Sequence, residues 1–266
     1  AVAAARLGSN VSMLGRVGQD SFGDFLIDNL KSSDVDSQFV QRDDASTGTA
    51  IIVVDENGQN SIVLSAGANG KVSIADAERA SFPDFDLLLL QLEIPTPTVL
   101  STTKLAKENG VRIILNPAPA KELPNELISL VDYIIPNETE LSLLTKTEVN
   151  DTSSAERAAK LLLDRGSQNV IVTLGSNGAL IVTQKSSKHI PSFKVDVVDT
   201  TAAGDAFIGG FATKLLEPAS LLNAVRYGCA CGTLATTKFG AQPSLPTKEE
   251  VEKLVRAQRA KNRLDD

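Results

Sequence analysis

Apolar positions recur along the chain at two spacings, and each spacing predicts one kind of element. Runs that alternate or are wholly apolar predict strands, and apolar residues three or four positions apart predict helices. The predicted strands lie at 10–17, 38–41, 47–54, 61–64, 87–92, 111–115, 133–135, 170–174, 179–183 and 193–198. The predicted helices lie at 1–8, 22–30, 73–80, 98–108, 154–163, 204–216, 219–239 and 248–260, with one more opening at Asn137.

The order of these elements indicates an α/β fold. From residue 73 onward strands and helices alternate with short connections, which predicts a parallel sheet with helices on both faces. The earlier runs differ, because 47–54 and 61–64 flank Asn57-Gly58, a pair that favours a tight hairpin turn. We therefore expect the early strands to be antiparallel. In a parallel sheet of this kind, ligands lie beyond the carboxyl ends of the strands.

The stretch from Asp199 to Phe207 has the most informative local chemistry. It follows the predicted strand at 193–198 and leads into a helix that begins near Ala203, with only small residues between them. Uncovered N–H groups at a helix N-terminus carry partial positive charge and bind phosphate oxygens. Asp205 lies in the first turn of that helix. Two readings stay open: a base that takes a proton from an attacking hydroxyl, or a complement to the helix dipole.

Polar residues and glycine follow several other predicted strands. Glu93, Asn116, Asn137 and Gly175 each come directly after a strand, so we expect them at one edge of one sheet. Asn137 and Glu140 lie three residues apart at a helix start. A carboxylate and an amide so placed suit water-mediated binding of Mg²⁺ near phosphates, and equally form a capping box.

The sequence lacks two common nucleotide-binding patterns. Gly70-Lys71-Val72 has neither the upstream glycine nor the hydroxyl residue of a Walker loop, and no Gly-x-Gly-x-x-Gly follows a strand. Phosphate binding would therefore use the turn at 201–204. The loop at 240–244 is consistent with closure over a nucleotide, with cation binding through carbonyl oxygens, or with a plain turn.

Composition narrows the class of partner. A net charge of −7 argues against a protein that binds duplex nucleic acid, and no apolar run approaches the roughly 20 residues that span a bilayer. Cys229 and Cys231 form no disulfide framework, which indicates a reducing compartment, the cytoplasm or an organelle stroma. Their spacing in a predicted helix favours core packing, and with a single histidine we expect no zinc site.

Several segments together resemble one family. Asp199-Thr200-Thr201-Ala202-Ala203-Gly204-Asp205 resembles the second signature of the PfkB carbohydrate kinases. Further segments, in the same order, resemble the ribokinase group of that family, and the resemblance extends from residue 1 to about 250. These segments are 91–93, 116–120 with 123–127, 136–140, 173–176 and 238–244.

The resemblance implies a fold and an activity. The fold is a three-layer α/β/α ribokinase-like sandwich with a mostly parallel central sheet and a small, incomplete β-sheet lid. The whole of 1–266 would be one domain, with lid strands from roughly 37–65 and a homodimer formed through the lid. The implied activity is ATP-dependent phosphorylation of a sugar, D-ribose at O5, giving ribose 5-phosphate. The alternatives are another sugar or a nucleoside as substrate, or a non-catalytic sugar- or nucleotide-binding protein.

The resemblance also implies a role for individual residues, with ATP, Mg²⁺ and a monovalent cation, K⁺, as cofactors. Asp205 would be the base that contacts the sugar hydroxyl, and Glu93 would bind other sugar hydroxyls. The implied anion hole consists of Ala202, Ala203 and Gly204. The implied nucleotide and Mg²⁺ residues are Asn137, Glu140, Thr173, Gly175, Ser176, Asn177, Gly178, Gly204 and Cys229. The implied K⁺ ligands are Asp199, Thr201, Ala235, Lys238, Gly240 and Ser244.

One departure from the family pattern concerns the start of the sequence. In the family, a strand with Asn and Asp residues that hold the sugar and a glycine-rich segment precede the helix that here begins at Ala1. The resemblance therefore implies a truncated form, for which full activity is not expected. Such a form is expected to expose a sheet edge without a partner, which favours aggregation or an altered dimer.

Overall fold

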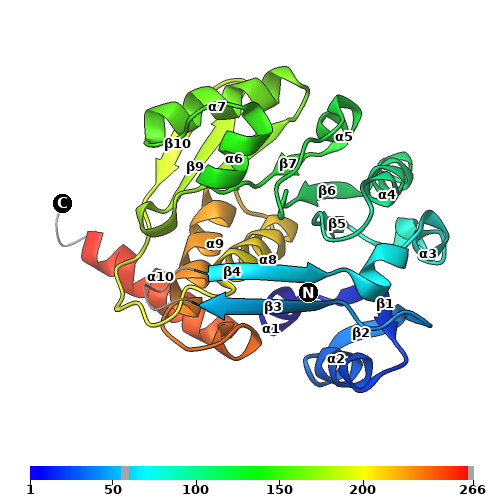
Figure 1. The fold of residues 1–266 in the computed structure, drawn as a ribbon. Helices are drawn as coiled ribbons and strands as arrows, with labels where there is room; N and C mark the ends of the chain where they lie inside the picture. The colour runs from blue at the N-terminus through cyan, green and yellow to red at the C-terminus, as the bar shows by residue number, and fades with distance from the viewer. Residues whose placement is uncertain (55–59, 263–266) are drawn as a thin grey trace.

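A six-stranded mixed sheet forms the centre of the computed structural model, which describes residues 1–54 and 60–262 (Figure 1). The strand order is β10-β9-β8-β7-β6-β5, in which β5 to β8 are parallel and β9 is antiparallel to both of its neighbours, β8 and β10. The strands are β5 (Leu87–Leu90), β6 (Arg112–Leu115), β7 (Tyr133–Ile134), β8 (Asn169–Thr173), β9 (Ala179–Thr183) and β10 (Ser187–Ile190).

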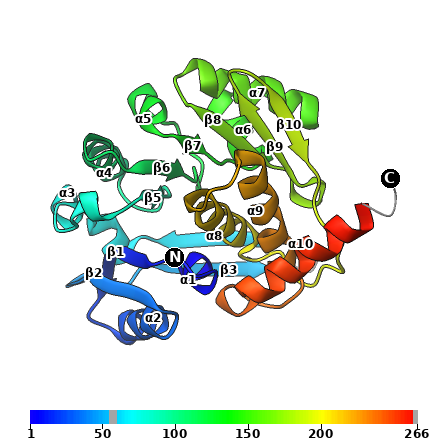
Figure 2. The same ribbon diagram turned by 180° about the vertical axis from the view of Figure 1, so that it is seen from behind.

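Helices cover both faces of this sheet, so the predicted three-layer α/β/α architecture is confirmed (Figures 1 and 2). Alternate residues of one strand explain the layers: Ile114 packs into one buried cluster, and its neighbours Ile113 and Leu115 pack into the other. One face carries α1 (Val2–Arg6), α8 (Ala203–Leu216), α9 (Leu221–Ala235) and α10 (Lys248–Asn262). The other carries α3 (Ile74–Ala77), α4 (Thr96–Glu108), α5 (Asn125–Leu130), α6 (Glu138–Thr145) and α7 (Thr152–Asp164). Short 3₁₀ turns occur at Gly67–Lys71, Phe82–Asp84, Gly175–Asn177 and Gln242–Ser244.

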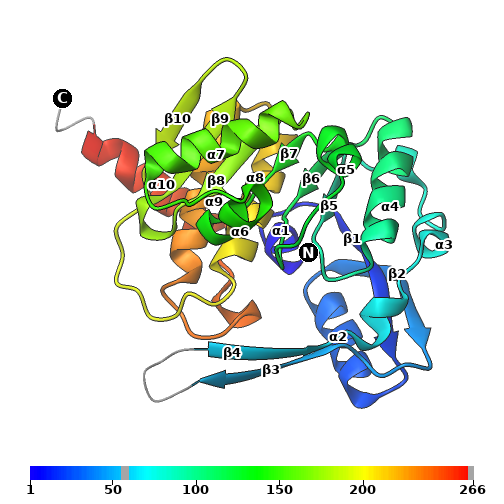
Figure 3. The ribbon, with the colours of Figure 1, turned by 45° about the horizontal axis from the view of Figure 1, so that its top comes forward.

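The first part of the chain forms two separate strand pairs. β1 (Val11–Gly18) pairs with β2 (Val35–Asp43) in parallel, and α2 (Ser21–Ser32) connects them. The prediction that the early strands are all antiparallel is thus wrong for β2, because a helical crossover returns the chain in the same direction. β3 (Thr49–Val54) and β4 (Asn60–Ser65) are antiparallel, as predicted, and extend as a ribbon away from the helices (Figure 3). The predicted Asn57-Gly58 turn lies outside the described residues.

The strand β5 is an edge, although its sequence is wholly apolar. In the described part of the chain β5 pairs only with β6, and Leu89 is 38% exposed. A wholly apolar sequence is typical of a strand that is buried on both faces, and β5 departs from that pattern in its exposure. An edge strand presents N–H and C=O groups that can pair with another chain.

The predicted strand at 193–198 is absent, and this is a correction of the sequence analysis. The segment after Ile190 is irregular up to α8, and Val197 is 62% exposed. The N–H groups of Val198 and Asp199 donate instead to the carbonyl of Thr236, at 2.7 and 3.2 Å. The same carbonyl lies just beyond α9, which ends at Ala235 and not at the predicted residue 239. Tertiary contact with a helix end thus replaces strand pairing. The sequence analysis also missed α5.

Packing in the core indicates which aromatic substitution should most reduce the stability of the fold. Phe211 on α8 is fully buried, and its ring packs edge-to-face on Tyr133 of β7 with centroids 5.4 Å apart. We expect Phe211→Ala to lower the free energy of unfolding by about 3–5 kcal/mol, since it leaves a cavity. Urea denaturation followed by circular dichroism measures the change. Phe22→Ala on α2, where the ring is 61% exposed, is the matched control and should cost no more than about 0.5 kcal/mol. Equal costs for the two variants would contradict this account of the core.

Candidate functional site

The turn before α8 leaves its N-terminal N–H groups open. Ala202, the N-cap residue, adopts a left-handed conformation with φ 60° and provides no side-chain cap. The N–H of Ala203 donates to the carbonyl of Thr200 at 3.2 Å. The N–H groups of Ala202, Gly204 and Asp205 have no acceptor in the described part of the chain. A Cβ added at Gly204 would meet nothing within 4 Å, so the space in front of this turn is open. The turn has the features of an anion site.

Two carboxyl groups lie close enough at this end of α8 for their charges to interact. Asp205 is exposed in the first turn of α8, and Glu93 follows β5. Partial desolvation raises the pKa of Glu93, and the nearby negative charge of Asp205 raises it further. The structure thus brings together two of the residues that the sequence analysis selected. A base that accepts a proton from a hydroxyl and a second group that binds neighbouring hydroxyls need such proximity.

Two residues that the sequence analysis missed hold the Glu93 segment in place. The side chain of Gln91 accepts a hydrogen bond from the Glu93 N–H at 2.5 Å. The ammonium of Lys121 donates to the carbonyl of Leu92 at 2.9 Å, and burial lowers the pKa of that lysine. Gln91 is two residues from Glu93, so its role was visible in principle as a local side-chain-to-backbone contact. Nothing local marks Lys121, because it reaches Leu92 across the sheet edge.

The capping reading of Asn137 and Glu140 is realised in the structure. The Asn137 side chain accepts from the Glu140 N–H, and the Glu140 carboxylate accepts from the Asn137 N–H, both at 2.8 Å. Burial raises the pKa of Glu140, and the hydrogen bond from Asn137 opposes that rise. Capping uses one carboxylate oxygen, and no residue in the described ranges hydrogen-bonds to the other. Within the described residues no group of three or more acidic, His or Cys side chains forms a metal cage. A divalent ion at Glu140 would therefore depend on water and phosphate oxygens, as Mg²⁺ commonly does.

The end of β8 lies next to Asn137. A parallel bridge joins Asn137 to Thr173, and the Thr173 N–H donates to the Pro136 carbonyl at 3.0 Å. The following turn requires glycine at Gly178, where φ is 94° and an added Cβ would lie 2.6 Å from the Ser192 nitrogen. The residues 173–178 therefore lie on the same sheet edge as Asn137 and Glu140.

Cys229, unlike the other residues selected for the nucleotide site, lies in the core on α9. Its side chain is 5% exposed, and burial raises the pKa of its thiol to about 12.

Asp199 connects the turn before α8 to the loop at 236–244. One carboxylate oxygen accepts from the N–H and hydroxyl of Thr201, at 2.9 and 2.7 Å, and the other accepts from the Gly240 N–H at 2.9 Å. These hydrogen bonds lower the pKa of Asp199. The structure thus brings Asp199, Thr201 and Gly240 into one network. A buried side chain of Ser244 donates to the Ala241 carbonyl at 2.7 Å.

The two other predicted cation ligands lie at the end of α9. The Ala235 carbonyl accepts a long hydrogen bond, 3.5 Å, from the Lys238 N–H. The Lys238 ammonium forms an ion pair with Glu250 at 2.8 Å, so its charge is neutralised away from the network around Asp199.

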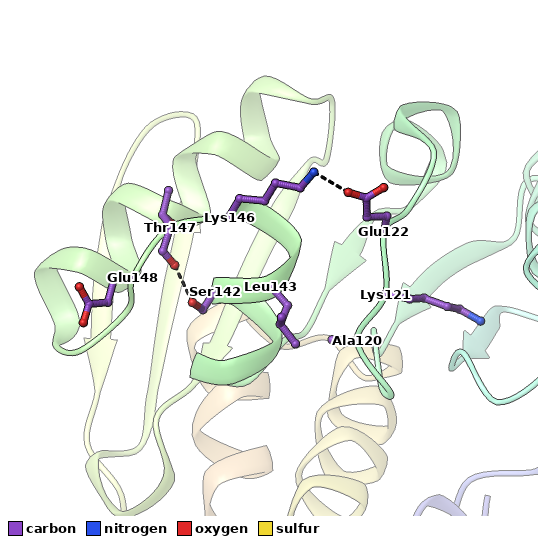
Figure 4. Close-up of a pocket in the computed structure, with 8 residues that line it drawn as sticks. All are labelled: Ala120, Lys121, Glu122, Ser142, Leu143, Lys146, Thr147 and Glu148. Atoms are coloured by element: carbon purple, nitrogen blue, oxygen red, sulfur yellow. Dashed lines mark hydrogen bonds and ion pairs between the residues drawn. The ribbon is translucent and has the colours of Figure 1, made fainter.

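Figure 4 shows a pocket of about 500 Å³ between α6 and the segment 120–122. An ion pair between Lys146 and Glu122 spans it, and Ser142 donates to the carbonyl of Thr147 at 2.6 Å. None of the site residues selected from the sequence lines this pocket. The candidate site is therefore the open sheet edge in front of α8. No helix within residues 1–54 and 60–262 is long and apolar enough to cross a membrane.

Comparison with known proteins identifies similar chains. The family model described as pfkB family carbohydrate kinase matches residues 1–248. Ribokinase of Haemophilus influenzae is 43% identical over 253 residues, which cover 94% of this chain and 83% of that protein. Deoxyribokinase of Salmonella typhi is 39% identical over 254 residues, covering 94% of this chain and 83% of the other. The structure of Arabidopsis thaliana ribokinase complexed with ribose and ATP matches with a TM-score of 0.89 at 32% identity, covering 96% and 84% of the two chains.

Proposed function

The chain belongs to the pfkB family of carbohydrate kinases and is an ATP-dependent sugar kinase, and we propose that it phosphorylates D-ribose at O5. The observation that carries the proposal is the turn before α8. It combines open N–H groups at a helix N-terminus with a carboxylate, Asp205, in the same first turn. The relatives reported above act on ribose or deoxyribose, and the structural relative holds ribose and ATP.

The geometry supports a direct transfer. The Asp205 carboxylate accepts the proton of the ribose O5 hydroxyl as that oxygen attacks the γ-phosphorus of ATP, and the bond from phosphorus to the ADP oxygen breaks. Negative charge on the transferring group is stabilised by the N–H groups of Ala202, Gly204 and Asp205. Ala203, selected as a third anion-hole residue, contributes mainly by placing this turn, because its N–H already donates to Thr200. Glu93 binds a second sugar hydroxyl.

The nucleotide occupies the adjoining part of the sheet edge in this proposal. The turn Gly175-Ser176-Asn177-Gly178 and Thr173 line the ATP, and Asn137 contacts its phosphates. Glu140 holds Mg²⁺ through water; the ion neutralises phosphate charge when bound. Cys229 would lie at the base of the nucleotide site, as part of the buried surface of α9.

A monovalent cation, K⁺, would bind between the turn before α8 and the loop at 236–244. The hydrogen bonds of Asp199 already join these two segments. Carbonyl oxygens of Ala235, Lys238 and Gly240 are hard ligands of the kind such ions prefer. The cation would steady the anion-hole turn and take no part in bond making.

We propose that 1–266 is one domain whose lid includes the ribbon of β3 and β4, and that two copies pair through this lid. Ile51 and Leu64 are exposed on that ribbon, and burying them favours such a contact.

The net charge of −7 supports the absence of a nucleic-acid partner, and the free buried cysteines support a cytoplasmic or stromal location.

A coupled assay of ADP release tests the substrate. We expect the highest kcat/KM with ribose, and lower values with 2-deoxyribose, fructose and adenosine. A preference for 2-deoxyribose or adenosine would move the chain to another specificity within the family. ADP release with none of the four would favour the non-catalytic reading.

Replacement of the base tests the mechanism. Asp205→Asn keeps the size of the side chain but removes the proton acceptor, so kcat should fall at least about 100-fold while ATP still binds. Kinetics and isothermal titration with ATP measure the two properties. Asp196→Asn, in the exposed loop before the turn, is the matched control and should leave kcat unchanged. Near-normal turnover of Asp205→Asn would remove the proposed role.

Exchange of the monovalent cation tests the proposed K⁺ site. Replacing K⁺ by Na⁺ at constant ionic strength should lower the rate severalfold, because the smaller ion fits the carbonyl ligands less well. The difference should shrink in Asp199→Asn, in which the network is weakened. Identical rates in K⁺ and Na⁺ for the unmodified chain would exclude a selective cation site.

A further inference from the structure

Arg6, the last residue of α1, contacts the loop that follows α9. Its guanidinium nitrogen Nη1 donates to the carbonyl of Gln242 at 2.8 Å and to the carbonyl of Leu245 at 3.0 Å. The acceptors are 236 and 239 positions away in the sequence. Ser244, one of the proposed cation ligands, lies between the two acceptor residues. The arginine therefore holds the part of the loop that belongs to the proposed cation site.

The backbone hydrogen bonds within this loop are long. The Lys238 N–H donates to the Ala235 carbonyl at 3.5 Å, and the N–H groups of Ser244 and Leu245 donate to carbonyls of the same loop at 3.3 Å. The usual range for such bonds is about 2.7–3.2 Å. Long hydrogen bonds hold a backbone weakly, so contacts with other elements contribute much of what fixes the position of this loop.

Two contacts connect the loop to α8. At one end the Asp199 carboxylate, in the turn before α8, accepts from the Gly240 N–H at 2.9 Å. At the other end Arg6 ties the loop to α1, and α1 lies against α8 (Figure 2), where a Cβ added at Gly209 would meet α1 at 2.6 Å. The position of the loop relative to the anion-hole turn therefore depends on both Asp199 and Arg6.

We propose that Arg6 is a positioning residue for the monovalent-cation site, which holds the loop where its oxygens can bind the ion together with the turn before α8. Arg6 does not bind the ion, because a guanidinium offers only hydrogen-bond donors. A site made largely of carbonyl oxygens needs several of them in place at once, so a less ordered loop binds the ion more weakly. The inference rests on the proposed function, since it presupposes the cation site.

The direction of the effect distinguishes positioning from simple charge. The Arg6 guanidinium keeps its positive charge at any pH of interest. Acting through charge alone, it would repel a nearby cation, and its removal would tighten K⁺ binding. Acting through the position of the loop, its removal weakens K⁺ binding.

Thermal unfolding without substrates is the main measurement. The chain is heated in increasing KCl and followed by circular dichroism, at an ionic strength held constant with tetramethylammonium chloride, whose cation is too large for such a site. An ion that binds only the folded chain raises Tm, and the dependence of Tm on concentration gives an apparent Kd. Arg6→Gln should raise the apparent Kd for K⁺ at least about fivefold, because both hydrogen bonds from the charged donor are lost.

The coupled assay of ADP release gives a second measurement. In Arg6→Gln the K⁺ concentration that gives half of the maximal rate should rise by the same factor as the apparent Kd. The KM for ribose, measured at saturating K⁺, should stay within about twofold of its value in the unmodified chain, because Arg6 acts on the cation site and not on the sugar.

Two further variants separate this contact from a general loss of stability. Arg6→Lys should weaken K⁺ binding only about twofold, because Nη1 alone makes both contacts and an ammonium can replace it in part. Arg165→Gln is the matched control. Arg165 also donates to two backbone carbonyls, those of Leu123 at 2.8 Å and Leu144 at 3.0 Å, but on the opposite face of the sheet. Its replacement should lower Tm and leave the apparent Kd for K⁺ unchanged.

The results distinguish failure of this inference from failure of the cation site. An apparent Kd for K⁺ that is unchanged or lower in Arg6→Gln, or that rises equally in Arg165→Gln, overturns the positioning role and leaves the cation site standing. Should Arg6→Gln not fold, an apparent Kd in Arg6→Lys equal to that of the unmodified chain overturns it. A Tm of the unmodified chain that does not change as K⁺ replaces tetramethylammonium removes the cation site, and the inference with it.

Discussion

The position of the first turn of α8 is the constraint on which the candidate site depends, and close packing between helices sets it. A Cβ added at Gly209 would lie 2.6 Å from the Cβ of Ala3 on α1. A Cβ added at Gly232 on α9 would lie 3.0 Å from the carbonyl oxygen of Ala203, the residue at which α8 begins. Because side chains are absent at these two contacts, α1 and α9 can hold α8 with its open end at the carboxyl edge of the sheet. Larger residues there would push the helix, and with it the anion-hole turn, away from Glu93.

The turn before α8 is unfavourable for folding by itself, and hydrogen bonds from neighbouring residues offset that cost. N–H groups without acceptors at a helix start, beside a left-handed Ala202, are unfavourable for folding alone. Asp199 compensates by ordering both the turn and the loop at 236–244 through its two oxygens. Such ordering before substrate arrives is what electrostatic stabilisation of a transferring group requires. The same logic applies to Asn137 and Glu140, whose capping hydrogen bonds hold the side chains in the orientation that nucleotide phosphates would meet.

Long-range packing decided most of what the sequence analysis got wrong. The apolar run at 193–198 has strand composition, yet it pairs with no strand among the described residues, and the Thr236 carbonyl at the end of α9 accepts from the N–H groups of Val198 and Asp199. The apolar run of β5 matches a buried strand, but its place in the strand order makes it an edge. Likewise β2 follows a helix and pairs in parallel with β1, a relation that no local pattern contains. The contact between Lys121 and Leu92 joins residues 29 positions apart, and it went unnoticed for the same reason.

The amino-acid sequence alone determined the features that arise from neighbouring residues. These are the alternation of strands and helices, the start of α8 at Ala203, the capping pair at Asn137 and Glu140, and the polar residues that follow the strands, since each depends on spacing within a few positions. Tertiary structure alone decided which strands pair, which edge is exposed, and which carboxyl group lies close to Asp205. The physical reason is that pairing, burial and pKa depend on which distant residues come into contact, and hydrophobic patterning specifies the buried face of an element but not its partner.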